Sequence, residues 1–215
     1  MNREVMAFLC GYAVQKKIKN QTLKKLCSFD LKPKFALMKS KVLDILYDSF
    51  YDNGSVNFVV KQDAKKEQRI KTLLEYSYYK GERFGKIFLS DDETTAAIII
   101  DPKKDKFSFW ELKLIFKVIG LRGLSKLLKR EKNLKKFKPK QDFNYLWYVG
   151  VKATHQGQGK GSKLIQQIMQ EPDGKALHLQ TSNPRNFPLY ERLGFNFDGD
   201  YSQPGYAVKI YTYSK

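Results

Sequence analysis

The sequence has few of the side chains from which metal centres and disulfide frameworks are built. Its 215 residues include only two cysteines, Cys10 and Cys27, and two histidines, His155 and His178. Their spacings match no metal-ligand pattern, so we expect no metal site. Two cysteines also make no disulfide framework, which favours a reducing cytoplasm.

Long hydrophobic runs are lacking as well. The apolar run 5–14 is too short to span a bilayer. It is a weak candidate for a secretory signal, because Glu4 cancels the positive charge of Arg3 and no small-residue cleavage pattern stands out. We therefore expect a soluble, cytoplasmic protein without a membrane partner.

Acidic residues are scarce beside basic ones. The chain has 22 Asp and Glu against 40 Lys and Arg, a net charge of +18. Such an excess suits an anionic partner, whether nucleic acid, a membrane surface or a phosphorylated ligand, but a solvated lysine-rich surface accounts for it equally well. Hydrophobic residues at 42% and aromatics at 14% indicate a folded globule, and the length suits one domain.

The rest of the chain is organised around residues 145–170. Their first part is aromatic and β-branched, as in a strand, and their last part has apolar residues at helical spacing. Between the two lies Gln156-Gly157-Gln158-Gly159-Lys160-Gly161-Ser162. Glycines on alternate positions permit close approach of a ligand, and a helix N-terminus attracts anions. The pattern predicts a strand–turn–helix that holds a phosphate-bearing ligand.

Spacing separates three phosphate-loop motifs here. A P-loop requires GxxxxGK[ST], but Thr154 stands where its first glycine belongs, and Gly161 follows Lys160. A dinucleotide fingerprint requires GxGxxG on an early βαβ unit, whereas this loop has GxGxG late in the chain. The third motif, Q/R-x-x-G-x-G/A, is met by residues 156–161. On these residues the sequence resembles the GNAT superfamily of N-acetyltransferases; the alternative is a glycine-rich turn without a ligand.

A second segment, residues 181–195, strengthens the resemblance. It contains N-x-x-N-x-x-x-Y-x-x-x-G-F, common in that superfamily after the phosphate loop, as Asn183, Asn186, Tyr190, Gly194 and Phe195. The resemblance is strong over 145–195 and extends by the order of elements over about 40–215. We therefore expect a GNAT domain at 39–215 and an N-terminal extension at 1–38. The implied fold is α/β, a mixed and mostly antiparallel sheet flanked by helices, with the fourth and fifth strands splayed to admit the pantetheine arm.

The resemblance also implies an activity, a co-substrate and a site. The activity is transfer of an acetyl group from acetyl-CoA to an amine by direct attack on the thioester. Tyr190 is the expected general acid, since a phenol keeps its proton at neutral pH; the alternative is a packed aromatic. Main-chain groups of the strand are expected to contact the pantetheine of acetyl-CoA, and one N–H there to stabilise the oxyanion: Val149, Gly150 and Val151. Main-chain groups of the loop are expected to hold the pyrophosphate: Gln156, Gly157, Gln158, Gly159, Lys160, Gly161 and Ser162. Asn183 is expected to hydrogen-bond the pantetheine, and Asn186 either does the same or caps its helix.

Elements outside the motifs are expected from periodicity. Helices are predicted near 21–26, ended by Pro33, from an N-cap at Ser40 to residue 50, and at 63–79. Strands are predicted at 85–89, 94–100, 176–181, 195–197 and 208–213, and an apolar segment at 56–60. Residues 107–135 read as an amphipathic helical region. We expect an apolar stripe of Leu121, Leu124, Leu127 and Leu128 to pack on the sheet there, with a solvated basic face of Lys126, Lys129, Arg130 and Lys132. The alternative is a helix that contacts the substrate or a nucleic acid.

Several questions stay open at this stage. Asp142, Glu111 and Glu93 are conceivable general bases without support, His155 is expected to point away from the thioester, and His178 is expected to be an ordinary strand residue. The acceptor, a small-molecule or protein amine, the length of the acyl group and the oligomeric state are not readable. A competing hypothesis is a basic nucleic-acid-binding module on a catalytically inactive GNAT scaffold, which predicts salt-sensitive binding.

Overall fold

The computed structural model describes residues 21–203 and 205–214. The chain divides into two units, Met1–Ser40 and Lys41–Lys215. The second unit carries the sheet and both sequence motifs. In the described part of the chain, no helix combines the length and the apolar character that crossing a membrane requires.

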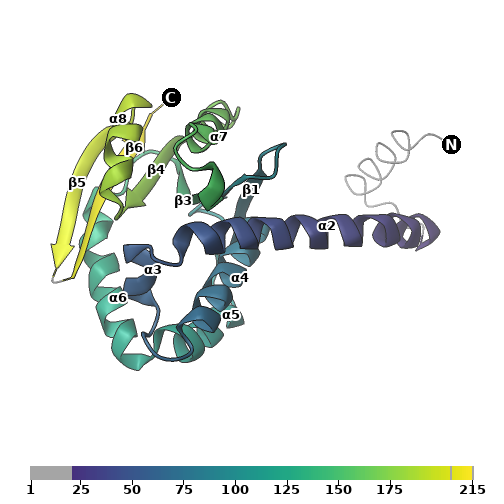
Figure 1. Cartoon of the computed structure of the whole chain (residues 1–215), viewed down its shortest axis with the longest axis horizontal. Helices are drawn as coiled ribbons and strands as arrows, with labels where there is room; N and C mark the ends of the chain where they lie inside the picture. The colour runs from purple at the N-terminus through teal and green to yellow at the C-terminus, as the bar shows by residue number, and fades with distance from the viewer. Residues whose placement is uncertain (1–20, 204, 215) are drawn as a thin grey trace. The chain divides into compact units, whose positions relative to one another are not determined.

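The second unit is built on a six-stranded mixed sheet with the order β1-β2-β3-β4-β6-β5 (Figure 1). Only β3 and β4 pair in parallel; the other neighbours are antiparallel. The predicted α/β fold with a mixed, mostly antiparallel sheet and flanking helices is confirmed. The strands are β1 (Gly85–Leu89), β2 (Thr95–Ile100), β3 (Phe143–Val151), β4 (Ala176–Thr181), β5 (Asn196–Gln203) and β6 (Tyr206–Tyr213).

Helices cover both faces of the sheet. One face packs against α7 and α8 through a core that includes Leu164, Ile165 and Tyr190. The other face packs against α4, α6 and the last turns of α2, where Leu134 joins the alternate residues of β6. The main helices are α2 (Gln21–Phe50), α3 (Gly54–Val59), α4 (Lys66–Phe84), α5 (Phe109–Leu114), α6 (Leu121–Leu134), α7 (Lys160–Met169) and α8 (Phe187–Arg192); the short turns are η1 (Ile115–Ile119, π), η2 (Lys135–Phe137), η3 (Ala153–His155) and η4 (Pro184–Asn186).

Some predicted boundaries are wrong. Helix α2 continues through Pro33, and Ser40 is no N-cap, because its hydroxyl donates to the Leu37 carbonyl at 2.9 Å within the same helix. The helix predicted at 63–79 ends at Phe84 instead, and the predicted strand 195–197 continues to Gln203. Packing against the rest of the protein extends these elements, and the local preferences of single residues do not report such packing.

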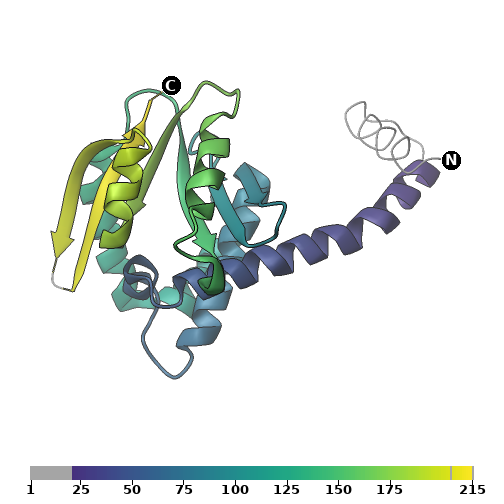
Figure 2. The same ribbon diagram turned by 45° about the horizontal axis from the view of Figure 1, so that its top comes forward.

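The sheet opens between β3 and β4. Their parallel ladder runs from Phe143↔Ala176 to Leu146↔Leu179 and stops there, while β3 continues to Val151 beside β2. Figure 2 shows the two strands, in green, diverging toward the ends that lead into α7 and α8. The opening was predicted between the fourth and fifth strands, but the strands that part are the third and fourth along the chain. The candidate site lies at the ends where they part.

Candidate functional site

A β-bulge in β3 lies at the point where β3 and β4 separate. Ile98 of β2 pairs with Tyr148, but the next residue, Ile99, pairs with Leu146, so Trp147 is an extra residue in β3. A bulge bends a strand and frees a backbone group from the ladder. It therefore marks where β3 turns away from β4 and where a backbone N–H can face a ligand.

The end of β3 is held by the last turns of α2. A Cβ on Gly150 would lie 2.8 Å from Ser49 Oγ, so glycine permits this close approach. Ser49 Oγ lies 2.9 Å from the Val151 carbonyl, which also accepts from Gln156 Nε2 at 3.1 Å. Asp48 accepts the Ala153 N–H at 2.7 Å. Helix and loop are thereby fixed to the strand before the glycine run begins.

The glycine loop presents an open helix N-terminus. Gly157 and Gly159 have φ of +77° and +73°, a left-handed conformation that glycine adopts readily. A Cβ at either position would meet no atom within 4 Å, so both glycines border open space. Gly159 is the N-cap of α7 without a side-chain cap, and the N–H groups of the first turn have no acceptor within the helix. These features suit an anion such as a pyrophosphate.

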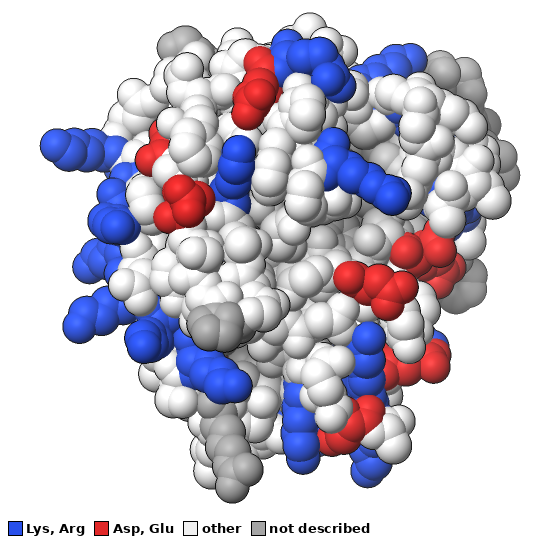
Figure 3. Space-filling model, turned by 60° about the vertical axis from the view of Figure 1, so that its left-hand side comes forward, with Lys and Arg blue, Asp and Glu red and all other residues white. Residues whose placement is uncertain are grey.

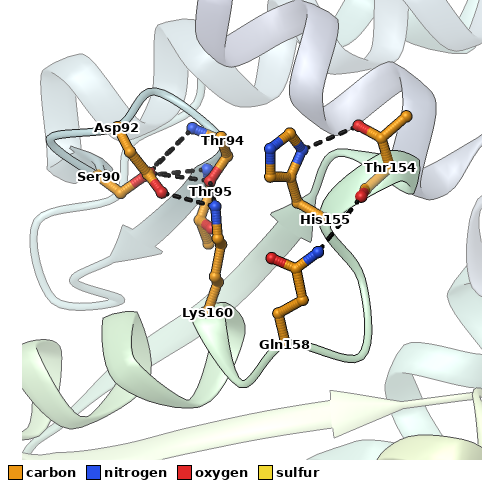
Figure 4. Close-up of polar contacts among 8 residues, drawn as sticks. All are labelled: Ser90, Asp92, Thr94, Thr95, Thr154, His155, Gln158 and Lys160. Carbon is orange, nitrogen blue, oxygen red and sulfur yellow. Dashed lines mark hydrogen bonds and ion pairs between the residues drawn. The ribbon is translucent and has the colours of Figure 1, made fainter.

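The Lys160 side chain turns away from the loop toward the β1–β2 hairpin. Figure 4 shows it extending from α7 to Asp92, 2.8 Å from the carboxylate, and to Thr94 Oγ1 at 3.2 Å. The hydrogen bond from Lys160, with those from Ser90 and Thr94, holds the pKa of Asp92 well below its usual range. Through its side chain, Lys160 thus joins the hairpin to the helix.

The other polar side chains of the loop make short-range contacts. His155 Nδ1 lies 2.8 Å from Thr154 Oγ1, and Gln158 Nε2 lies 3.5 Å from the Thr154 carbonyl, as Figure 4 shows. Gln156 reaches back to Val151. Ser162 lies half-buried in the first turn of α7. His155 is engaged with its neighbour at the loop.

The two asparagines of the second motif flank the short turn η4. Asn183 Oδ1 accepts the Arg185 N–H at 3.1 Å, and its carboxamide nitrogen has no partner within the described residues. Asn186 occupies the N-cap position of α8, but its side chain makes no capping hydrogen bond. Both follow β4 directly, on the side of the opening opposite the glycine loop.

Tyr190 lies in α8 with its ring in the core. Ring centroids of Phe195 and Tyr211 lie 5.6 and 5.7 Å from it, and the residue is 7% exposed. Burial, with the nearby Tyr211, raises the pKa of Tyr190 to about 12. Its hydroxyl finds no hydrogen-bond partner among the residues that the structure describes. Tyr190 is thus both a packed aromatic and a phenol that keeps its proton.

The acidic residues considered as bases are held in ion pairs. Lys41 binds Glu93 at 2.5 Å, and Lys103 binds Asp142 at 2.5 Å. Glu111 accepts from Lys80 at 2.9 Å and from the Ser108 N–H at 2.8 Å. Burial pushes the pKa of Glu111 upward, but the hydrogen bonds from Ser108 and Lys80 outweigh it and bring the pKa to about 2. Each of these three carboxylates is thus engaged by a lysine.

His178 lies on β4, facing away from α7 and α8, and is 1% exposed. Its Nδ1 lies 2.9 Å from Thr212 Oγ1, which donates to Asp198 at 2.5 Å. The Thr212 hydroxyl has given its one proton to Asp198, so Nδ1 must be the donor and Nε2, buried and unpartnered, carries the lone pair. Although Asp198 lies 3.8 Å away, burial dominates and lowers the pKa of His178 to about 4.

Sequence reasoning assigned three residues of α6 to the wrong environment. Arg130 was expected on the solvated face of the basic helix, but it is 9% exposed, whereas Leu121 and Leu128 of the supposed packing stripe are 72% and 60% exposed. The spacing Leu127, Arg130, Leu134 could have indicated a buried face, since these positions lie on one side of a helix. The Trp147 bulge had no sequence signal. Among the described residues, no group of three or more His, Cys, Asp or Glu side chains is arranged to hold a metal ion.

Comparison with known proteins identifies the family. The model of the acetyltransferase (GNAT) family matches residues 76–195, more than half of the chain. The chain belongs to the GNAT acetyltransferase family. The matched segment contains the β3 bulge, the glycine loop and the asparagine–tyrosine motif.

Individual relatives agree with this assignment. An uncharacterized N-acetyltransferase of Schizosaccharomyces pombe is 42% identical over 53 residues, which are 24% of this chain and 22% of that protein; the chain thus matches about a fifth of that relative's length. Two solved structures share the fold of this GNAT chain. A Corynebacterium glutamicum protein described as histone acetyltransferase HPA2 and related acetyltransferase is 21% identical (TM-score 0.60, covering 81% of this chain and 88% of that one). The C-terminal condensation domain of Ebony is 11% identical (TM-score 0.61, covering 82% and 94%).

Proposed function

We propose that this GNAT chain is an N-acetyltransferase that moves the acetyl group of acetyl-CoA directly to an amine. The observation that carries the proposal is the open N-terminus of α7, with two left-handed glycines that border open space, at the edge where β3 and β4 separate. The loop fits a pyrophosphate, and the divergent strands fit the arm that follows it. The catalytic domain is residues 39–215, and residues 1–38 are an extension.

Donor binding is assigned to main-chain groups. The N–H groups of residues 156–162 hold the pyrophosphate, and the dipole of α7 adds to the attraction. Val149, Gly150 and Val151 line the arm from β3, and the free carboxamide nitrogen of Asn183, with Asn186, supports it from the other side. The bound donor supplies a thioester carbonyl activated toward amines.

Two protein groups then act on the reacting atoms. A backbone N–H near the Trp147 bulge stabilises the negative charge that develops on the carbonyl oxygen. Tyr190, whose pKa is raised to about 12, gives its proton to the departing thiolate. The amine must reach the site neutral, because a protonated amine has no lone pair with which to attack.

The test is a transfer assay. Purified protein is incubated with acetyl-CoA and a panel of primary amines, while free CoA and acetylated amine are measured separately, the latter by mass spectrometry. The proposal expects both products in equal amounts. Free CoA without acetylated amine would show hydrolysis and contradict it.

A further inference from the structure

A polar cluster of buried and half-buried residues lies directly beyond the last paired residues of β3 and β4. It consists of Ser55 in α3, Arg130 in α6, Gln180 in β4, Ser182 after β4 and Tyr206 in β6. Gln180 follows Leu179, where the parallel ladder stops, and is therefore level with the Trp147 bulge. Residues far apart in the sequence thus converge on the opening, on the face opposite α7.

Arg130 is the centre of this cluster. Its Nε donates to Tyr206 Oη at 3.0 Å, its Nη2 to Gln180 Oε1 at 2.9 Å and its Nη1 to Glu131 at 2.5 Å. A guanidinium has five N–H groups, so one remains on each terminal nitrogen. The hydroxyls continue the cluster: Ser55 Oγ lies 3.2 Å from Tyr206 Oη and 3.0 Å from Ser182 Oγ.

Arg130 carries a buried charge, and its carboxylate partner is itself half-exposed. A buried charge is costly unless it is paired. Among the described residues, its one hydrogen-bonded carboxylate is that of Glu131, whose side chain is 47% exposed; Tyr206 and Gln180 are neutral. A planar guanidinium with N–H groups to spare matches an oxyanion such as a carboxylate or phosphate.

From this geometry we infer that the acceptor is an amine that also carries an oxyanion, which Arg130 binds. The inference rests on the proposed function, since it places the acceptor beside the donor arm in the opening of the sheet. The guanidinium has a second consequence there. A dication such as a diamine is repelled.

The test uses four acceptors of the form H₂N–CH₂–CH₂–X. X is a carboxylate in β-alanine, a phosphate in phosphoethanolamine, a hydroxyl in ethanolamine and an ammonium in ethylenediamine. Wild type should transfer acetyl to one or both anionic acceptors about ten- to a hundredfold faster in kcat/KM than to ethanolamine, as a charge-assisted hydrogen bond implies. Which anionic acceptor is faster distinguishes carboxylate from phosphate.

Two variants assign the preference to Arg130. Arg130→Gln should abolish it, while acetyl-CoA still binds with the wild-type Kd. Gln180→Glu is isosteric and places a carboxylate on the guanidinium, so it keeps the fold and should shift the preference toward ethylenediamine. A merely structural Arg130 would lower all four rates together.

Other results overturn the inference. One is a wild type that acetylates ethanolamine or ethylenediamine faster than both anionic acceptors. Another is a preference for anionic acceptors that is unchanged in Gln180→Glu. A third is a wild type that binds acetyl-CoA but neither acetylates an anionic acceptor nor binds one in calorimetry. Failure of the proposed function looks different, because wild type would then either not bind acetyl-CoA or release CoA without acetylating any amine of the panel.

Discussion

Tyr190 and His178 are both buried, but burial acts on their protons in opposite directions. Each neutral form is favoured, so the phenol keeps its proton and the imidazole loses its own. Tyr190 can therefore serve as an acid at neutral pH. His178 instead links β4 to β6 through Thr212 as a neutral residue.

Replacing Tyr190 by Phe removes the acid and leaves the ring packing in place. We expect kcat to fall by about a hundredfold, as for loss of a general acid, with an unchanged Kd for acetyl-CoA. Tyr211→Phe is the matched control, since it removes a hydroxyl from the adjacent ring, one that binds Glu191. Equal rates for wild type and Tyr190→Phe would leave Tyr190 as a packed aromatic only.

His178 makes stability dependent on pH. Its pKa is about 4 in the folded protein and 6.5 ordinarily, so the unfolded chain takes up the proton first. The contribution of His178 to the free energy of unfolding is complete above pH 6.5. It falls as the pH drops toward 4, by up to about 3 kcal/mol. Urea unfolding at pH 7.5 and at pH 4.5 measures this. His178→Gln should lose less stability than wild type between the two; equal losses would contradict the assignment.

At the scale of elements, the contact between α2 and β3 positions the glycine loop. Gly150→Ala should destabilise the protein by about 1–3 kcal/mol, because its Cβ would lie 2.8 Å from Ser49 Oγ and 3.0 Å from Leu46 Cδ2. Chemical unfolding measures the loss, and the double variant Ser49→Ala/Gly150→Ala should recover part of it. Full stability of Gly150→Ala would show that the two elements are not tightly packed.

Elements with strong local signals could be predicted from the sequence. Strands 85–89 and 176–181 have the predicted bounds, because alternation and flanking turns mark them locally. The glycine loop was found because glycine itself is the requirement. The bulge at Trp147 could not be found, since it exists only relative to Ile98 and Ile99 in another strand. Arg130 was misassigned because its burial depends on Tyr206 and Gln180, distant in sequence.

At the scale of the whole molecule, the charge excess gathers unevenly. Figure 3 shows lysine and arginine side chains protruding along the left edge of the face shown, where acidic side chains are few. The lysines of α6 and the following segment, Lys126, Lys129, Lys132, Lys135 and Lys136, are exposed. A nucleic-acid-binding module would use such a surface and would lose affinity steeply with salt. The proposed binding of acetyl-CoA at α7 does not require this surface.

The most direct test is calorimetric titration of acetyl-CoA into wild type, Gly159→Asn and Gly159→Asp. Asn and Asp both tolerate the left-handed conformation of Gly159, and their Cβ would meet no atom within 4 Å, so the two variants differ essentially in charge. We predict micromolar binding by wild type, similar binding by Gly159→Asn, and at least about tenfold weaker binding by Gly159→Asp, because its carboxylate would face the pyrophosphate. Equal affinities of the Asn and Asp variants, or no binding by folded wild type, would contradict the account.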